Sequence, residues 1–269
     1  MTTDTPPTYE KRVVAFIDIL GFTNYVKTKS NSATGFAAIY DALKELEEYF
    51  KSIGIHHDAS SKEFFRDDTQ VITVSDCIVI SRRIDERGGI YQMLWDCDFA
   101  THLLIKRGFL CRGGIAVGDL YHKDNTIFGP AYLNAYNLER TAINPVIKFY
   151  QELFDVAAAY PFPGNEEYGA DEAQDIKEYC KPVEDEPNAY YLDYFTNYDS
   201  RYGGGEGTAS IHYEELRKTL VAGLSENKAR DSKEKIKVFD KYAWAARRYN
   251  LTAHNFELAL VEIPPPIEQ

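Results

Sequence analysis

Two aspartates stand where the chain could present oxygen ligands to a cleft. Asp18 ends an apolar run and is followed by a glycine turn at Gly21. A run of this kind is typical of a buried strand, so the carboxylate at its end points into a cleft. Asp76 lies between two further apolar runs, residues 71–74 and 77–80, at the expected tip of a β-hairpin. Taken singly, Asp18 also fits a cap of the next element and Asp76 an ordinary turn residue.

The elements that position these aspartates follow from the spacing of apolar residues. Strands are expected at residues 12–19, 70–74, 77–82, 109–121, 126–128 and 146–149, and helices at 34–53, 89–106 and 129–142. This β-α-β-β-α-β-β-α-β order is a ferredoxin-like plan with an additional hairpin. It predicts an α+β fold in which helices pack against one face of a mainly antiparallel sheet.

The last third of the chain is expected to be different in character. Residues 160–188 are acidic and predict an irregular segment, and the glycine-rich stretch 201–205 predicts a flexible loop. Amphipathic helices are expected at 212–224 and 233–249, packed on the sheet domain or on a partner. The basic residues from Lys233 to Lys241 are interpreted as a solvated helix face.

This pattern suggests three segments. Residues 1–9 are expected to form a flexible tail, residues 10–200 the main domain and residues 201–269 a C-terminal helical extension.

Composition restricts the class of protein. The 269 residues are 44% hydrophobic and 14% aromatic, as in an ordinary globular protein. The net charge of −12 argues against a nucleic-acid binder but not against a nucleotide substrate, because metal ions can neutralise a triphosphate. No apolar stretch reaches membrane-spanning length, and the first residues lack the apolar core of a signal peptide. The four cysteines show no close pairing, so we expect reduced thiols in a cytoplasmic protein that is not bound to a membrane.

Longer strings of residues carry a more specific signal. Residues 16–23 read Phe-x-Asp-Ile-x-Gly-Phe-Thr, and residues 112–119 read Arg-Gly-Gly-Ile-Ala-Val-Gly-Asp. The segment 127–131 and the later residues Ala135 and Leu138-Glu139 follow. In order and spacing, residues 12–150 resemble the class III nucleotide cyclases.

The resemblance implies a two-metal lyase that takes a nucleoside triphosphate. Asp18 and Asp76 would be catalytic and would hold two Mn²⁺ or Mg²⁺ ions, with the backbone carbonyl of Ile19 as a third ligand. One ion would lower the pKa of the ribose 3′-hydroxyl and the other would hold the β- and γ-phosphates. The 3′-oxygen would then attack the α-phosphorus in line, and pyrophosphate would leave.

Further residues are assigned to the nucleotide by the same resemblance. Arg112 would contact the triphosphate, since a planar cationic fork suits phosphate oxygens. The amides of Leu20, Gly21 and Phe22 stand where a helix begins and can bind phosphate, and Phe16 belongs to the same string.

The resemblance also implies a homodimer with active sites at the subunit interface. One subunit would bring Asp18, Asp76 and Arg112, and the other the catalytic helix and the residues that face the base.

The sequence departs from the cyclase pattern on that catalytic helix. Typical members have an Asn and an Arg four residues apart, where this chain has Leu133 and Asn137. Asn134 and Arg140 lie nearby and could substitute, and Asn137 is the expected catalytic residue at the Arg place. Loss of both groups leaves open a catalytically inactive nucleotide sensor.

The base-reading positions depart as well. Ile72 and Thr126 stand where adenylyl cyclases carry charged residues, so strong purine selection is not expected. In this the chain is similar to the pyrimidine cyclases of Pycsar anti-phage systems. That resemblance implies cyclic UMP, or alternatively cyclic CMP, made as a messenger for a separate effector protein. A diguanylate cyclase relative would share the sheet plan, but the Gly-Gly-Asp/Glu-Glu-Phe string is missing at the hairpin.

Overall fold

The chain folds around its first strand, β1 (Glu10–Ile19), which has antiparallel partners on both sides: β3 (Cys77–Arg83) and β4 (Cys111–Lys123). The computed structural model describes residues 7–53, 68–86, 88–195, 208–253 and 258–265. The other strands are β2 (Gln70–Val74), β5 (Thr126–Phe128), β6 (Ile147–Tyr150), β7 (Cys180–Pro182) and β8 (Ala189–Leu192). The helices are α1 (Phe22–Thr28), α2 (Ala33–Ile53), α3 (Gly89–Lys106), α4 (Pro130–Thr141), α5 (Glu152–Ala159), α6 (Gly169–Glu178), α8 (Thr208–Glu226) and α9 (Lys233–Ala253).

The strands form one sheet in the order β2-β3-β1-β4-β6-β8-β7, with β5 paired to the far end of β4. All neighbours are antiparallel except β4 and β6. The predicted α+β class and mainly antiparallel sheet are therefore confirmed.

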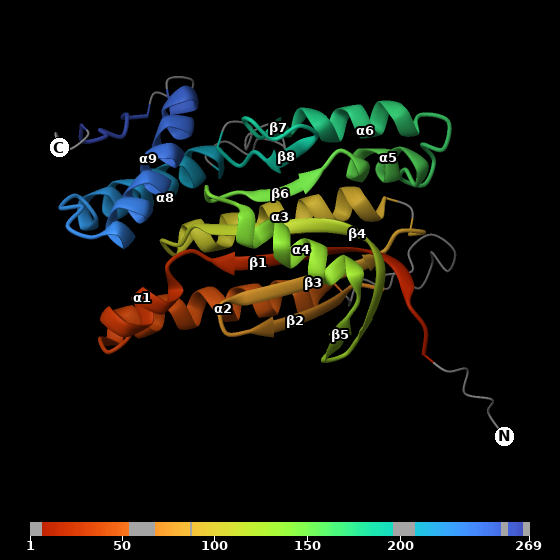
Figure 1. The fold of residues 1–269 in the computed structure, drawn as a ribbon, viewed down its shortest axis with the longest axis horizontal. Helices are drawn as coiled ribbons and strands as arrows, with labels where there is room; N and C mark the ends of the chain where they lie inside the picture. Colours follow the sequence, from red (N-terminus) through yellow and green to blue (C-terminus); the bar gives the residue numbers. More distant parts are fainter. Residues whose placement is uncertain (1–6, 54–67, 87, 196–207, 254–257, 266–269) are drawn as a thin grey trace.

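Both faces of the sheet are covered, which corrects the prediction of helices on one face. Side chains alternate along β1, so Val13, Ala15 and Ile17 pack toward the cluster that contains α2 and α3. Val14 and Phe16 face the other way, toward the Ala131, Ala135 and Leu138 side of α4. Figure 1 shows α4 in front of the sheet and α2 and α3 behind it. Coverage on both faces explains the unbroken apolar run of β1, since a strand that is buried on both faces has no polar side.

The segment 160–188 is not irregular as predicted. It contains α6, and the short strands β7 and β8 then extend the sheet beyond β6. Helix α6 buries Ala173 and Ile176 and turns its acidic residues outward. Ala173 and Ile176 are the two buried apolar side chains of this ten-residue helix besides Gly169, and so short an apolar pattern does not stand out from the acidic background.

The C-terminal helices α8 and α9 pack on the sheet domain. Their buried face, which includes Tyr213, Leu216, Phe239 and Tyr249, forms one cluster with Leu110, just ahead of β4, and residues of β8. Division of the chain into domains at residue 200 stays a prediction. Residues 1–6 of the predicted tail and the glycine-rich loop 201–205 lie outside the described residues. None of the described helices is long and apolar enough to cross a membrane.

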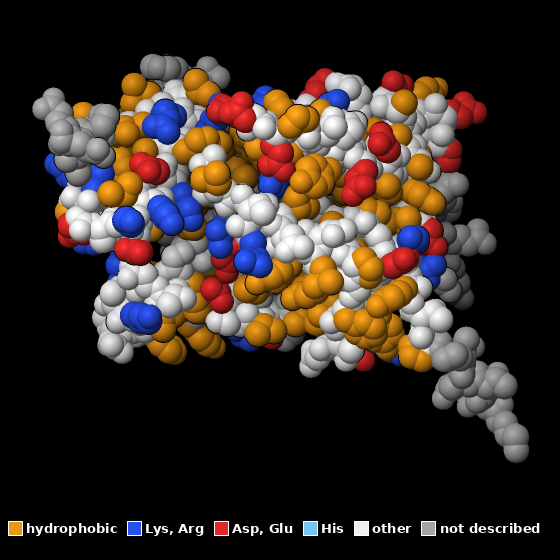
Figure 2. Space-filling view, in the orientation of Figure 1, with side chains coloured by type: hydrophobic (Ala, Val, Ile, Leu, Met, Phe, Trp, Pro, Cys, Tyr) orange, Lys and Arg blue, Asp and Glu red, His pale blue; other side chains and the backbone are white. Residues whose placement is uncertain are grey.

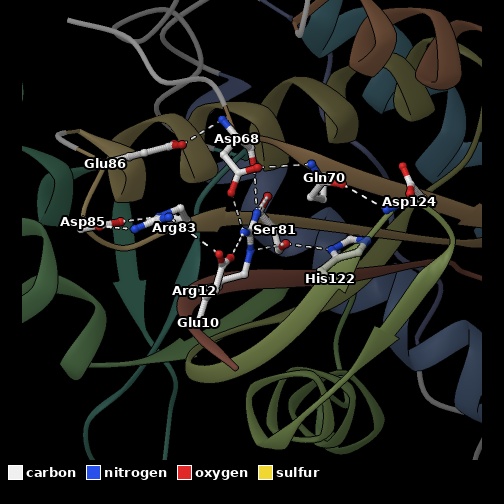
Figure 3. A network of polar contacts seen from close by, with 10 residues as sticks. All are labelled: Glu10, Arg12, Asp68, Gln70, Ser81, Arg83, Asp85, Glu86, His122 and Asp124. Atoms are coloured by element: carbon white, nitrogen blue, oxygen red, sulfur yellow. Dashed lines mark hydrogen bonds and ion pairs between the residues drawn. The ribbon is translucent and has the colours of Figure 1, made fainter. Parts of the chain in front are cut away.

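A buried arginine closes the end of β1 that lies away from Asp18 (Figure 3). Arg12 is 1% exposed and donates to the carboxylates of Glu10 and Asp68, each at 2.6 Å. Its Nε donates to Ser81 Oγ, which in turn contacts His122 Nδ1 at 2.8 Å. This network joins β1, β3 and β4 to the segment that leads into β2.

The network predicts an acid-sensitive contribution to stability from His122. Burial, followed by the charge of Arg12, lowers the pKa of His122 to about 4. An unfolded chain takes up that proton near pH 6.5, so the free energy of unfolding falls as the pH drops from about 6.5 toward about 4. We expect His122→Gln to flatten this part of the curve, measured by urea unfolding at several pH values. Tyr25→Phe is the control, because it removes a hydrogen bond to the Gly35 carbonyl outside this network and should cost about 1 kcal/mol equally at each pH. Parallel curves for wild type and His122→Gln would contradict the prediction.

Candidate active site

The pairing of β1 on both sides determines what surrounds Asp18. In the sheet register Asp18 lies between Cys77 of β3 and Arg112 of β4. Its side chain is on the same face as Phe16, the face that α4 covers. The carboxylate is 18% exposed and therefore lies at the edge of the α4 contact, open in part to solvent.

Asp76 reaches the same place from the β2–β3 turn, as the sequence predicts. Ser75 takes a left-handed conformation with φ of 59°, which allows the tight reversal. The Ile19 amide donates to the Asp76 carbonyl at 3.2 Å and fixes the turn to the end of β1. As a result, ligand atoms of Asp18, Asp76 and Cys77 lie within 4.8 Å of one another.

Charge is unevenly compensated in this cluster. Arg112 Nε lies 2.5 Å from Glu139 Oε1 of α4 and 3.7 Å from Asp18 Oδ2. Burial, together with the carboxylates of Asp76 and Glu139, raises the pKa of Asp18 to about 7, although Arg112 acts in the opposite direction. Burial also raises the pKa of Glu139. The site is therefore short of positive charge.

The donor set fits a hard divalent cation. Carboxylate oxygens are the ligands that Mg²⁺ and Mn²⁺ prefer. The Cys77 thiol donates to Asp18 Oδ1 at 3.7 Å, and burial with the two aspartates raises its pKa to about 12. A protonated thiol is a weak ligand, so the metal-binding capacity rests on Asp18 and Asp76. Ile19 buries its side chain in the core at 1% exposure, so it has only its backbone to offer.

The turn after Ile19 corrects one expectation. The Leu20 amide donates to the Leu110 carbonyl at 2.8 Å, so it is not available to a phosphate group. Gly21, with φ of 76°, makes the turn into α1 and leaves its own amide and that of Phe22 as the remaining candidates. Leu20 packs its side chain against the apolar cluster that joins Leu110 and β8 to α8 and α9.

Other predicted site residues lie apart from the aspartates. Phe16 is 6% exposed, and its ring packs against Tyr132 and Tyr136 of α4. It is a core residue under the helix. Ile72 lies on β2 opposite Val79, which is itself level with Phe16, so it shares the face of Asp18 at a position further from the turn.

Thr126 and Asn137 do not join the Asp18 cluster within a single chain. Thr126 pairs with Lys123, the last residue of β4, whereas Arg112 lies near the first residue of that strand. Asn137 is exposed on α4, where its carbonyl accepts a hydrogen bond from Thr141 Oγ1 at 2.9 Å. Their part in the site stays a prediction that depends on a second subunit.

Sequence reasoning gave no role to three residues that the structure brings to the cluster. Cys77 follows Asp76 directly, and Glu139 is an acidic residue on the apolar face of a helix. Both features are visible in the sequence and could have indicated that these residues lie near Asp18. Lys241 is half-buried on α9 and interacts electrostatically with Arg112, Glu139 and Asp18. That corrects the interpretation of this helix face as solvated throughout.

No protein-family model matches this chain, and no match was found among curated proteins. Similar solved structures include the guanylyl cyclase domain of the RhoGC fusion protein from the fungus Blastocladiella emersonii, with 17% identity and a TM-score of 0.41 over 70% of this chain and 96% of that one. The adenylyl cyclase CyaB from P. aeruginosa has 17% identity and a TM-score of 0.40 over 69% and 94%. A bacterial light-regulated adenylyl cyclase has 13% identity and a TM-score of 0.41 over 79% and 100%. Likeness at this level is too distant to indicate a reaction.

The geometry predicts which residues bind a cation. We expect Asp18→Asn and Asp76→Asn each to weaken Mn²⁺ binding at least about tenfold, the loss typical of mutations even outside the direct ligands. Cys77→Ala is the matched control and should change the affinity little. The measurement is the free Mn²⁺ signal in electron paramagnetic resonance, with circular dichroism to confirm folding. An equal loss in Cys77→Ala would instead make the thiol part of the metal site.

Proposed function

We propose that this protein is a nucleotide cyclase, which converts a nucleoside triphosphate to its 3′,5′-cyclic monophosphate and pyrophosphate. The observation that carries the proposal is the convergence of Asp18 and Asp76 beside Arg112. Two carboxylates at fixed backbone positions, next to a cation with a planar fork, suit a metal-bound triphosphate.

Each residue of this cluster has a definite task under the proposal. Asp18, Asp76 and the Ile19 carbonyl would hold two Mn²⁺ or Mg²⁺ ions. Such ions, when bound, lower the pKa of the ribose 3′-hydroxyl and neutralise phosphate charge. Arg112 is held in place by Glu139 and can exchange that contact for triphosphate oxygens. The 3′-oxygen forms the new bond to the α-phosphorus as the bond to pyrophosphate breaks.

A homodimer would complete this site. Exposed apolar side chains gather over α4 and β5 (Figure 2). They include Phe128 at 50%, Leu133 at 57% and Tyr136 at 37% exposure, with Tyr9 packed on Phe128. A surface of this kind on the face that carries Asp18 supports pairing of two copies with two-fold symmetry. Asn137, exposed on the same helix, would then serve the partner's site.

A pyrimidine nucleotide is the proposed substrate. Neither Ile72 nor Thr126 offers a charged group to a purine edge, and a site without matched donors and acceptors selects purines weakly. We take UTP as the first candidate, with cyclic UMP as product, and CTP as the alternative. By the sequence resemblance to pyrimidine cyclases, the product would be a cytoplasmic messenger in anti-phage defence, read by a separate effector protein.

A second candidate function is a nucleotide sensor without catalysis. It is favoured by Leu133 and Asn137, which replace the Asn and the Arg expected to stabilise the transition state.

A product assay separates these functions. With all four ribonucleoside triphosphates at equal concentration and Mn²⁺, we expect a pyrimidine cyclic nucleotide to dominate by about tenfold, roughly 1.4 kcal/mol of discrimination. Asp18→Asn, shown to be folded, is the matched inactive control. A dominant purine product would contradict the pyrimidine assignment and leave the cyclase assignment intact. Binding of a triphosphate without any product would favour the sensor.

Mixed dimers test the shared site. Asp18→Asn and Asn137→Ala homodimers should each be inactive. After random subunit exchange, half of the dimers are mixed and each has one intact site of two, so about a quarter of wild-type activity should return. Activity is measured after exchange, and native mass spectrometry of differently tagged subunits verifies the mixed dimers. No recovery in verified mixed dimers would show that one chain supplies the whole site.

A further inference from the structure

The C-terminal helices lie against the turn that follows Asp18. Leu20 packs into the same apolar cluster as Phe239, Ala243 and Ala246 of α9. The loop after α1 is joined to the end of α8 by an ion pair between Lys29 Nζ and Glu226 Oε1 at 2.5 Å. Packing in this cluster therefore places α9 close to the turn that follows Asp18.

One residue of α9 interacts electrostatically with the Asp18 cluster. Lys241 is half-buried, two residues from the buried Phe239 and Ala243 along α9, and charges that act on it include those of Arg112, Glu139, Asp18 and, on its own helix, Lys237. In Figure 2 a band of Lys and Arg side chains runs from α9 toward α4, beside a smaller group of acidic side chains. Burial of the ammonium group lowers the pKa of Lys241, so its position costs free energy that a solvated lysine would not lose.

The neighbouring cation on α4 is arranged differently. Arg140 is exposed, and its guanidinium lies 5.6 Å from the centre of the Tyr136 ring on its own helix. Arg112 and Lys241 are cations from outside α4 whose charges lower the pKa of Glu139, against the larger effect of burial. Once divalent cations occupy Asp18 and Asp76, both side chains face a site with excess positive charge, which suits a polyphosphate.

We propose that Lys241 binds the β- and γ-phosphate groups of the substrate, so that the C-terminal helices supply part of the active site in the same chain as Asp18, Asp76 and Arg112. The proposal rests on the proposed cyclase function. Lysine is suited to this task as a compact point charge with three donors on a flexible stem. The leaving pyrophosphate would be held by the same side chain.

Kinetics on the full-length protein test this role. We expect Lys241→Met to raise KM for the preferred triphosphate about 10- to 100-fold, the range for loss of one hydrogen bond to a charged group. The value of kcat should change less, and Lys241→Arg should keep KM within about threefold because it retains the cation. Lys235→Met is the matched control, since Lys235 is on the same helix but pairs with Asp231.

Binding of inorganic tripolyphosphate with Mn²⁺, measured by calorimetry, gives a readout without turnover. Lys241→Met should weaken it by a factor similar to the rise in KM, and Lys235→Met should not. If wild type forms no cyclic product from any triphosphate, the cyclase proposal fails, while tripolyphosphate binding still decides the role of Lys241. If Lys241→Met does not fold, Lys241→Gln replaces it. Unchanged tripolyphosphate binding in a folded Lys241 variant overturns the proposal, even if kcat falls.

Discussion

Crowding of carboxyl groups around Asp18 is the constraint on which the rest of the site depends. Strand pairing fixes Asp18 between Cys77 and Arg112, and the hairpin turn and α4 then bring Asp76 and Glu139 to it. Arg112 is the one cation that approaches Asp18 within ion-pair distance in the described part of the chain. A folded protein keeps such an arrangement only if the packing of its elements stabilises it elsewhere. A divalent cation would relieve the repulsion, and packing that already holds the carboxylates together would favour its binding.

Helix α4 has two faces with different tasks. Its buried face packs on the sheet through Ala131, Ala135 and Leu138, and ends in Glu139, which holds Arg112. Its other face presents Leu133 and Asn137 to solvent. The same rigid element therefore positions a cation for the site of its own chain and offers a polar group at a surface suited to a second copy. Pairing of subunits and orientation of Arg112 would be coupled through one helix.

The sequence predicts the central part of this arrangement because it depends on local patterns. Apolar runs define β1, β2 and β3. Because β3 pairs with β1, the turn between β2 and β3 places Asp76 near the end of β1. The Leu20 amide could not be assigned in this way, because its partner Leu110 is distant in sequence. Lys241 was missed for a related reason. The helical period of α9 is visible in the sequence. What this helix packs against depends on contacts between distant parts of the chain, which the sequence does not show.

The two ends of β1 show how burial of charge separates structure from function. All five donors of the Arg12 guanidinium are used, by Glu10, Asp68 and Ser81, and the site is closed by residues of the chain itself. Buried charge that is fully hydrogen-bonded holds strands in register and leaves nothing for a ligand to add. At the other end, the pKa of Asp18 is raised to about 7 because burial and its acidic neighbours outweigh Arg112. Charge left without full compensation in a partly open site is what a ligand of opposite charge can stabilise, so the end at Asp18 is the one suited to bind such a ligand.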